Sequence, residues 1–395
     1  MENIIFNDEL DGFCNKYIFK GGLGEKTPHL FDLEHERISR NICEQLLRHD
    51  GVAIKVNGTN APLAILINLF GERNLEELLE QNAIQFILWT PMVTTLASDN
   101  FPDGLLPLQF GNLSKDAVYG DPEKSIDEGF KILTRPIPRK QRRNLTRKLL
   151  KSYRLPSEEI SSNAVTFGHD GYKNNKFSPL GFANTKEITK LNASERRTLL
   201  KFTNESLELA VISEMKLNTI NNYNLMRLNE LEFENLTKSK TIQDYQNKLF
   251  QLEQVPNFSE MIKLGMLDIE SIPKVRSTKN AIKFRKWINN IADGDEDVEI
   301  SKQYIESISN NKSKLDTTTG KITRSLVVTA VSGTVGTALA GPVGSLIGGG
   351  IGAFVINPAL DFSIDMLDTF VLDGVLKGWN PKHYFDNDIK KIIQN

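Results

Sequence analysis

Residues 51–70 read GVAIKVNGTNAPLAILINLF, and this stretch decides the fold class. The run Gly51–Val56 is apolar and rich in β-branched residues, which predicts a buried strand. Asn57–Asn60 predicts a turn whose last two residues can cap a helix. Pro62 is well tolerated in a first helical turn, so a helix is expected to include Leu63–Phe70. A strand, a turn and a helix in this order indicate an α/β domain.

The flanking segments extend the same pattern. Apolar residues recur at helical spacing over Leu30–Leu47, which predicts an amphipathic helix before the strand. Leu75–Leu79 predicts another short helix, and Ala83–Trp89 predicts a further strand or buried segment that Pro91 ends. We therefore assign residues 1–130 to an α/β domain.

Composition limits the classes of protein to consider. The chain has 395 residues, of which 39% are hydrophobic and 25% charged, an ordinary balance for two or three globular domains. The net charge of -2 gives no general attraction to nucleic acid or acidic lipid, so any such attraction must be local. Cys14 and Cys43 are too few for a disulfide framework or a cysteine zinc site. Met1–Phe19 carries several acids and predicts no secretion signal, which favours a cytoplasmic protein.

A basic helical segment is expected at residues 131–155. Lys131–Arg154 contains ten Lys or Arg residues and no Asp or Glu. Seven of the basic residues fall on a predicted helix after Pro138: Arg139, Lys140, Arg142, Arg143, Arg147, Lys148 and Lys151. Such a helix can neutralise the phosphates of anionic lipid or of nucleic acid. The alternative is a solvated helix that pairs with acidic surface elsewhere in the chain.

Residues 156–186 are rich in Ser, Asn, Gly and Lys and predict a loop or linker. His169 and Asp170 are adjacent in it, but a catalytic pair needs a pocket that fixes both side chains, so catalysis is not favoured. The sequence has no nucleophile elbow and no clustered histidines. We predict no catalytic residue, cofactor or metal site, and an enzyme is not the favoured interpretation.

The rest of the chain before the C-terminal region predicts helices. Residues 187–310 are assigned to a helical domain with a long helix over Leu191–Met215. Trp287 lies on the apolar side of a basic amphipathic helix, where a core position is favoured over an interfacial one. A polar linker is expected at residues 311–324.

The most distinctive segment lies near the C-terminus. Ser325–Leu360 contains no charged residue or histidine among 36 residues, and eight of them are glycine. Small residues recur every fourth position: Ser332, Gly336, Ala340, Gly344, Gly348 and Gly352. In a helix this spacing gives one side-chain-poor face that another helix can approach closely, as in membrane proteins. Pro342 predicts a kink or a hairpin. Residues 325–358 are thus expected to be a membrane-seeking glycine zipper, and residues 359–395 an amphipathic helix and tail.

These observations predict a mixed, mostly α protein with an N-terminal α/β domain, a central helical region and a C-terminal glycine-zipper helix or helical hairpin. The favoured function is a membrane-associating effector that assembles in the inner membrane and perturbs or permeabilises it, as a pore-forming antiviral defence protein would. Its expected partners are membrane lipids and copies of itself. The alternatives are a nucleic-acid-binding regulator that uses the basic helix, and a soluble oligomeric scaffold with a buried hairpin.

Overall fold

The computed structural model describes residues 3–19, 28–96, 104–221, 223–227, 258–289, 384–389 and 391. The chain divides into two compact units, Met1–Lys240 and Thr241–Asn395. The predicted glycine zipper lies outside the described residues.

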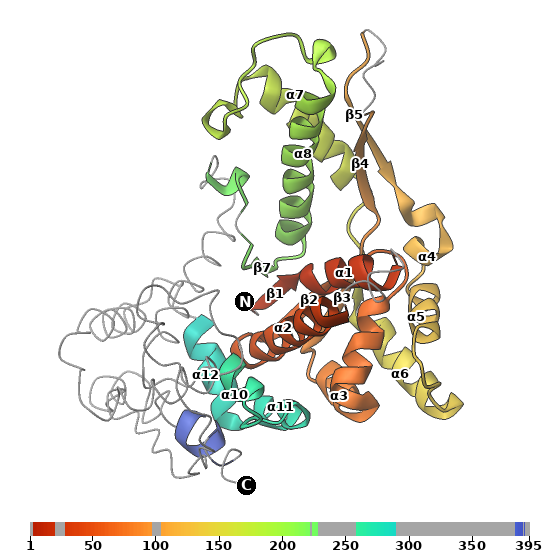
Figure 1. Cartoon of the computed structure of the whole chain (residues 1–395), viewed down its shortest axis with the longest axis vertical. Helices are drawn as coiled ribbons and strands as arrows, with labels where there is room; N and C mark the ends of the chain where they lie inside the picture. The colour runs from red at the N-terminus through yellow and green to blue at the C-terminus, as the bar shows by residue number, and fades with distance from the viewer. Residues whose placement is uncertain are drawn as a thin grey trace, which may run out of the picture. The chain divides into compact units, whose positions relative to one another are not determined.

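The first unit is built on a parallel sheet of five strands in the order β6-β3-β2-β1-β7 (Figure 1). The strands are β1 Ile4–Asn7, β2 Gly51–Val56, β3 Ile84–Leu88, β6 Tyr153–Arg154 and β7 Asn218–Thr219. β1, β2 and β3 are almost continuously buried, as expected for parallel strands that are covered on both faces.

Helices cover the two faces of this sheet (Figure 1). In chain order, β1, β2, β3 and β6 follow one another across the sheet in a single direction. Because the crossovers between parallel strands are right-handed, the helices that connect these strands lie on one face of the sheet. These helices are α1 Glu9–Cys14, α2 Pro28–Arg48, α3 Ala61–Glu80, α5 Pro122–Lys131 and α6 Arg139–Ser152. The return from β6 to β7 runs through α7 Ile160–Lys173 and α8 Ala193–Glu214. α8 reaches the opposite face of the sheet, where its Glu208 pairs with Lys55 of β2, and α7 packs on α8.

An antiparallel hairpin interrupts the parallel pattern between β3 and β6. Its strands are β4 Pro91–Thr95 and β5 Leu108–Asn112, and α4 Ala117–Gly120 follows. The hairpin packs on α7 and α8 through the buried side chains Val93 and Leu108. The hairpin, α7 and α8 share one apolar core with the face of the parallel sheet that α8 covers.

The described part of the second unit is helical. It contains α10 Phe258–Lys263, α11 Ile272–Arg276, α12 Lys279–Asn289 and a single π-helical segment at Tyr384–Ile389. Rings of Phe258, Phe284, Tyr384 and Phe385 contact one another, so a segment near the C-terminus completes this core. Trp287 is buried, which confirms its predicted core position.

The sequence predictions for the first unit are confirmed where the patterns were strong. The helix expected at Leu30–Leu47 is α2, and the strand expected at Gly51–Val56 is β2. Asn60 is the N-cap of α3, because its Oδ1 accepts a hydrogen bond from Leu63 N at 2.9 Å. The mostly helical composition with a parallel N-terminal sheet agrees with the expected fold class.

One expectation is wrong. Residues 156–186 were predicted to form a loop or linker, but they contain α7, which belongs to the core of the first unit. His169 is therefore buried on a helix and not exposed in a turn. The helix forms because packing outweighs weak helix propensity: an added Cβ at Gly168 would lie 2.3 Å from Thr203 Oγ1 of α8. Small residues here allow close approach of two helices and do not mark a loop.

Candidate functional site

Helix α6 carries the seven basic residues of the predicted basic helix, and it begins directly after Pro138 as the sequence predicted. The fixed φ of Pro138 suits the position before a helix. Leu145 and Leu149 are fully buried and hold α6 on the first unit, where it contacts α3 and α5. The polar side of the helix is thereby turned away from the core.

Two of the seven predicted cations have carboxylate partners on neighbouring helices. Arg142 Nη2 lies 2.8 Å from Asp127 Oδ1 of α5, and its guanidinium also lies over the ring of Phe130. Lys148 Nζ contacts Glu76 of α3 and lies 2.9 Å from Glu80 Oε1. These two cations fit the alternative of a basic helix that pairs with acidic surface of its own chain.

The other five cations are exposed and have no ion-pair partner in the part of the chain that the structure describes. At about 100° per residue they fall within an arc of roughly 120°, opposite Leu145 and Leu149. Leu150 is exposed in the same arc, and α6 contains no aromatic residue. We call this surface the cationic face; it consists of Arg139, Lys140, Arg143, Arg147 and Lys151.

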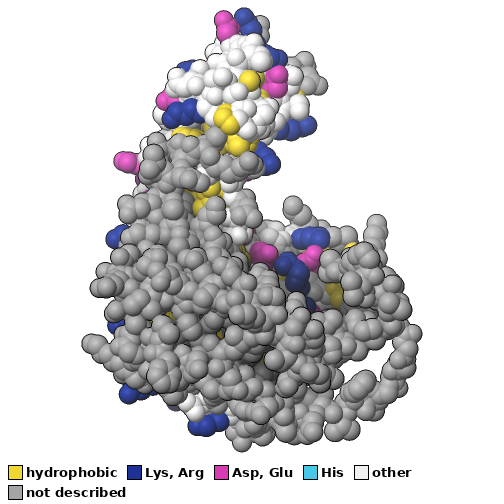
Figure 2. All heavy atoms as spheres, turned by 90° about the vertical axis from the view of Figure 1, so that its left-hand side faces the viewer, with side chains coloured by type: hydrophobic (Ala, Val, Ile, Leu, Met, Phe, Trp, Pro, Cys, Tyr) yellow, Lys and Arg dark blue, Asp and Glu magenta, His cyan; other side chains and the backbone are white. Residues whose placement is uncertain are grey.

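The cationic face can attract anionic groups that lie on a surface or along a polymer. Unpaired Lys and Arg side chains keep their full charge for an external partner, whereas Arg142 and Lys148 are already neutralised. By contrast, basic and acidic side chains are mixed on the upper part of the molecule in Figure 2. The positive charge of α6 is a local feature, because the whole chain has a net charge of -2.

The other predicted site residues are Ser332, Gly336, Ala340, Gly344, Gly348 and Gly352, all outside the described residues. Their assignment to helix packing or membrane contact remains a prediction.

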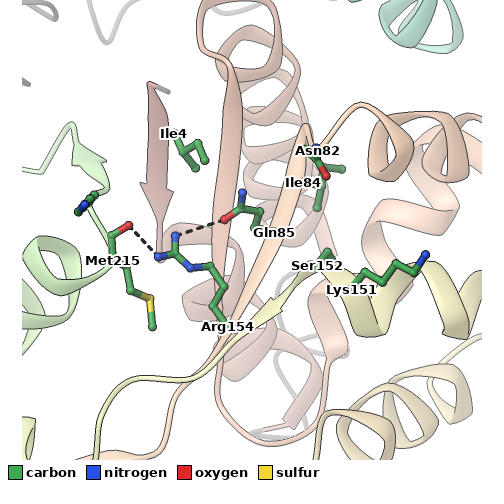
Figure 3. Close-up of a pocket in the computed structure, with 9 residues that line it drawn as sticks. Ile4, Asn82, Ile84, Gln85, Lys151, Ser152, Arg154 and Met215 are labelled. Atoms are coloured by element: carbon green, nitrogen blue, oxygen red, sulfur yellow. Dashed lines mark hydrogen bonds between the residues drawn. The ribbon is translucent and has the colours of Figure 1, made fainter. Parts of the chain in front are cut away.

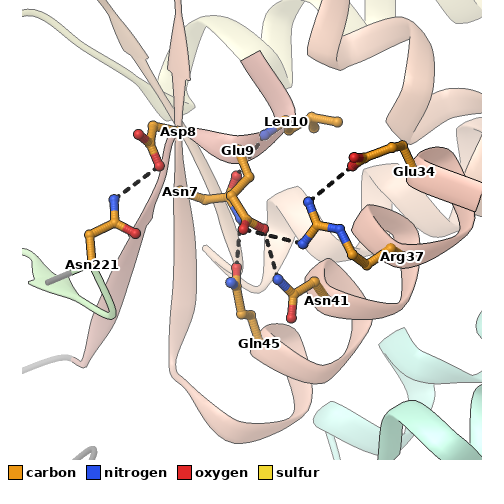
Figure 4. Close-up of polar contacts among 9 residues, drawn as sticks. All are labelled: Asn7, Asp8, Glu9, Leu10, Glu34, Arg37, Asn41, Gln45 and Asn221. Atoms are coloured by element: carbon orange, nitrogen blue, oxygen red, sulfur yellow. Dashed lines mark hydrogen bonds and ion pairs between the residues drawn. The ribbon is translucent and has the colours of Figure 1, made fainter. Parts of the chain in front are cut away.

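A second polar region lies at the carboxyl end of β1, next to β2 and β7 (Figure 4). Asp8 Oδ1 accepts a hydrogen bond from Asn221 Nδ2 at 3.1 Å, which joins the loops that follow β1 and β7. Glu9 accepts from Asn41 Nδ2 at 2.8 Å and lies 3.3 Å from Arg37 Nη1, both on α2. These contacts attach the start of α1 to its neighbours.

Asp11 extends this network to the end of β2. Its Oδ1 accepts from the backbone N–H of Asn57 at 3.2 Å, and its Oδ2 accepts from the side chains of Asn57 and Asn15. Burial raises the pKa of the Asp11 carboxyl, although these hydrogen bonds and the charge of Lys55 act in the opposite direction. A buried, hydrogen-bonded acid in this place fixes the turn between β2 and α3.

A lysine lies at the same edge of the sheet, on the face covered by α8. Lys55 Nζ lies 3.2 Å from Glu208 Oε1 and 4.0 Å from the ring centre of Trp89. The Tyr223 hydroxyl donates to Glu208 Oε2 at 3.1 Å, and burial together with Glu208 raises the pKa of Tyr223. The cluster couples β2, β3, α8 and the segment after β7.

Ligands of open parallel sheets bind outside the carboxyl ends of the strands, so the carboxyl edge of this sheet is the expected place for a ligand site. Here its acids are engaged with amide donors, Arg37 and Lys55. Among the described residues no group of three or more His, Cys, Asp or Glu is placed to hold a metal ion. Sequence reasoning missed this region because it did not recognise β1; the apolar Ile4–Phe6 before an acid-rich turn was the available signal.

Comparisons with family models, with curated proteins and with solved structures find no match to this chain. Within the described ranges, no helix combines the length and the apolar character needed to cross a membrane.

Proposed function

We propose that this protein is a membrane-associating effector. Its cationic face docks on anionic headgroups, and residues 325–358 assemble in the inner membrane and perturb or permeabilise it. The observation that carries the proposal is the cationic face: five exposed, unpaired cations on one side of α6. Each Lys or Arg near a negatively charged membrane contributes about 1 kcal/mol to binding.

Two features support lipid as the partner of this face. Leu150 is exposed among the cations, and an apolar side chain gains free energy when it enters the headgroup region. The absence of aromatic residues from α6 removes the stacking platforms that single-stranded nucleic acid commonly uses. The charge-free segment Ser325–Leu360 supplies the second attachment that stable membrane association needs.

The experiment that tests this proposal is fractionation of cells that express either the full chain or a form that lacks residues 325–358 and keeps the core segment Tyr384–Ile389. We expect the full chain to be recovered with membranes and to resist extraction by high salt. The shortened form should be released by salt, because only electrostatic attraction holds it. Recovery of both forms in the soluble fraction would contradict the proposal and favour the oligomeric scaffold.

A nucleic-acid-binding regulator is the second candidate, and it uses the same cationic face. Neutralisation of about five phosphates by this face would make the logarithm of the affinity for duplex DNA fall with a slope of roughly -4.5 against the logarithm of salt concentration. A filter-binding titration at several salt concentrations measures this slope. A steep slope together with soluble fractionation would favour this candidate over the membrane effector.

A further inference from the structure

A pocket of about 340 Å³ lies at the amino edge of the parallel sheet, opposite the edge described above (Figure 3). Ile4 and Ile84, the first residues of β1 and β3, form apolar parts of its wall. Its polar wall comes from the end of α6, from β6, from the segment after α8, and from Asn82 and Gln85 at the start of β3. A volume of this order fits a small molecule and not a folded partner.

The charged side chains that line the pocket all have the same sign. They are Lys151, Arg154 and Lys216, and no Asp or Glu is among the lining residues. The ammonium groups of Lys151 and Lys216 have no hydrogen-bond or ion-pair partner in the described part of the chain. The nearby Glu214 accepts hydrogen bonds from the backbone N–H and the hydroxyl of Ser157, at 3.1 and 2.9 Å.

Arg154 is the fixed member of this group. Its Nη2 donates to the carbonyl of Met215 at 2.8 Å and its Nη1 donates to Gln85 Oε1 at 3.4 Å, so the guanidinium is held between α8 and β3 (Figure 3). Its remaining N–H groups have no partner among the described residues. A guanidinium in a fixed position offers a planar set of donors that matches a phosphate group.

Lys216 occupies a backbone position that normally takes glycine. Its φ is +53°, and it follows the last turn of α8, where Leu217 N donates to the carbonyl of Ile212 at 2.9 Å. This is a helix C-terminus closed by a left-handed residue, for which glycine is the common choice because it has no Cβ. A lysine here is unfavourable for the backbone, yet it is one of the residues that line the pocket.

We propose that this pocket binds a soluble small molecule that bears a phosphate group. Arg154 would contact the phosphate oxygens directly, and Lys151 and Lys216 would balance the remaining charge. The apolar wall at Ile4 would contact the uncharged part of the ligand. The pocket and the cationic face share Lys151 only, so substitutions at Arg154 and Lys216 separate this inference from the proposed function.

The test is isothermal titration calorimetry of the full chain with inorganic pyrophosphate, compared among four proteins. We expect Arg154→Gln to weaken binding at least tenfold and Lys216→Gly to weaken it about threefold to tenfold. Arg197→Gln removes one positive charge from the exposed surface of α8, outside both the pocket and the cationic face, and it should leave binding within twofold. The same variants are melted, and Lys216→Gly should keep or raise the melting temperature, by up to about 3 °C, because glycine relieves the left-handed backbone.

Several results would overturn the inference. They are the absence of pyrophosphate binding at millimolar concentration, equal losses for Arg197→Gln and Arg154→Gln, and unchanged binding in Lys216→Gly. Weaker binding together with a lower melting temperature in Lys216→Gly would mark that lysine as structural and contradict its assignment. Loss of vesicle binding by Arg154→Gln with normal pyrophosphate binding would assign this edge to lipid headgroups and not to a soluble ligand.

Discussion

Gly129 lies where α5 crosses the start of α3. A Cβ added at this residue would lie 2.3 Å from the carbonyl oxygen of Asn60, a distance that real Cβ atoms do not reach. The contact is to backbone, so no side-chain movement relieves it. Gly12, on the exposed side of α1, has nothing within 4 Å of the same position. The two glycines therefore differ in their packing and not in their type of secondary structure.

We expect Gly129→Ala to lower the free energy of unfolding by about 1–3 kcal/mol, because α5 must move away from α3. Gly12→Ala should raise it by about 0.5–1 kcal/mol, because alanine favours a helix over glycine. Urea denaturation of both variants measures these changes. A Gly129→Ala protein that is as stable as the wild type would show that α5 does not pack on Asn60 in this way.

His169 makes stability depend on pH. Burial lowers the pKa of this imidazole, and the charge of Lys173 one helical turn away acts in the same direction. The folded protein thus holds His169 neutral at pH values where the unfolded chain already binds a proton. Stability from this residue is fully present above the ordinary histidine pKa of about 6.5 and is lost as pH falls below it.

Comparison of the wild type with His169→Gln between pH 7.5 and 5 measures this effect. The wild type should lose stability relative to the variant at no more than about 1.4 kcal/mol per pH unit. The same substitution at the exposed His29 should keep the wild-type slope. A constant difference between the wild type and His169→Gln across this range would contradict the burial of a neutral imidazole.

At the scale of elements, α6 separates two uses of positive charge. Arg142 and Lys148 stand at the borders of the buried side and pair with α5 and α3, whereas the cationic face has no partner in the described ranges. The ion pairs of Arg142 and Lys148 hold α6 against α5 and α3, and the cations of the cationic face are available to an external anion.

The triple variant Lys140→Gln, Arg143→Gln, Arg147→Gln tests the outer side. Removal of three charges at about 1 kcal/mol each should weaken binding to phosphatidylglycerol vesicles by roughly 100-fold at low salt. Flotation of the form that lacks residues 325–358 gives this measurement without the charge-free segment. The control Arg142→Gln should change vesicle binding little and destabilise α6 slightly. An unchanged affinity in the triple variant would exclude the cationic face as the membrane contact.

Elements with a strong local signal were predictable, and elements that depend on distant packing were not. β-branched residues within Gly51–Val56 specify the strand locally, and Asn60 and Pro62 specify the start of the helix that follows. β1, β6 and β7 have only four, two and two residues, and they are strands because longer neighbours pair with them. α7 was missed because its buried side includes Gly168 and His169, which do not count as apolar in a periodic pattern.

For the candidate site, the sequence predicted the position of the basic helix but not which of its cations are paired. The charge count over Lys131–Arg154 located α6, but the division of its cations into paired and unpaired ones depends on α3 and α5, which are distant in sequence. The polar network after β1 and the pocket at the amino edge could not be predicted, because each joins residues from several strands. Arg154 and Lys216, for example, meet only after β6 and β7 enter the same sheet.

At the scale of the whole molecule, two attachments are proposed to act together. The cationic face gives reversible attraction to an anionic surface, and the charge-free segment Ser325–Leu360 provides assembly within it. Neither is sufficient alone under this proposal: surface attraction is lost in salt, and a glycine-rich segment with few large apolar residues inserts weakly. Because the segment inserts weakly by itself, we propose that α6 binds the membrane surface before residues 325–358 assemble in it.

The most direct test of this proposal is release of a trapped dye from phosphatidylglycerol vesicles by the full chain. Gly348→Leu places a large side chain on the small-residue face, whereas Gly350→Leu makes the same change on the opposite side of a helix. We expect Gly348→Leu to reduce the rate of dye release at least tenfold and Gly350→Leu to leave it within twofold. Equal release by both variants and the wild type, or no release by the wild type, would contradict assembly through a glycine zipper.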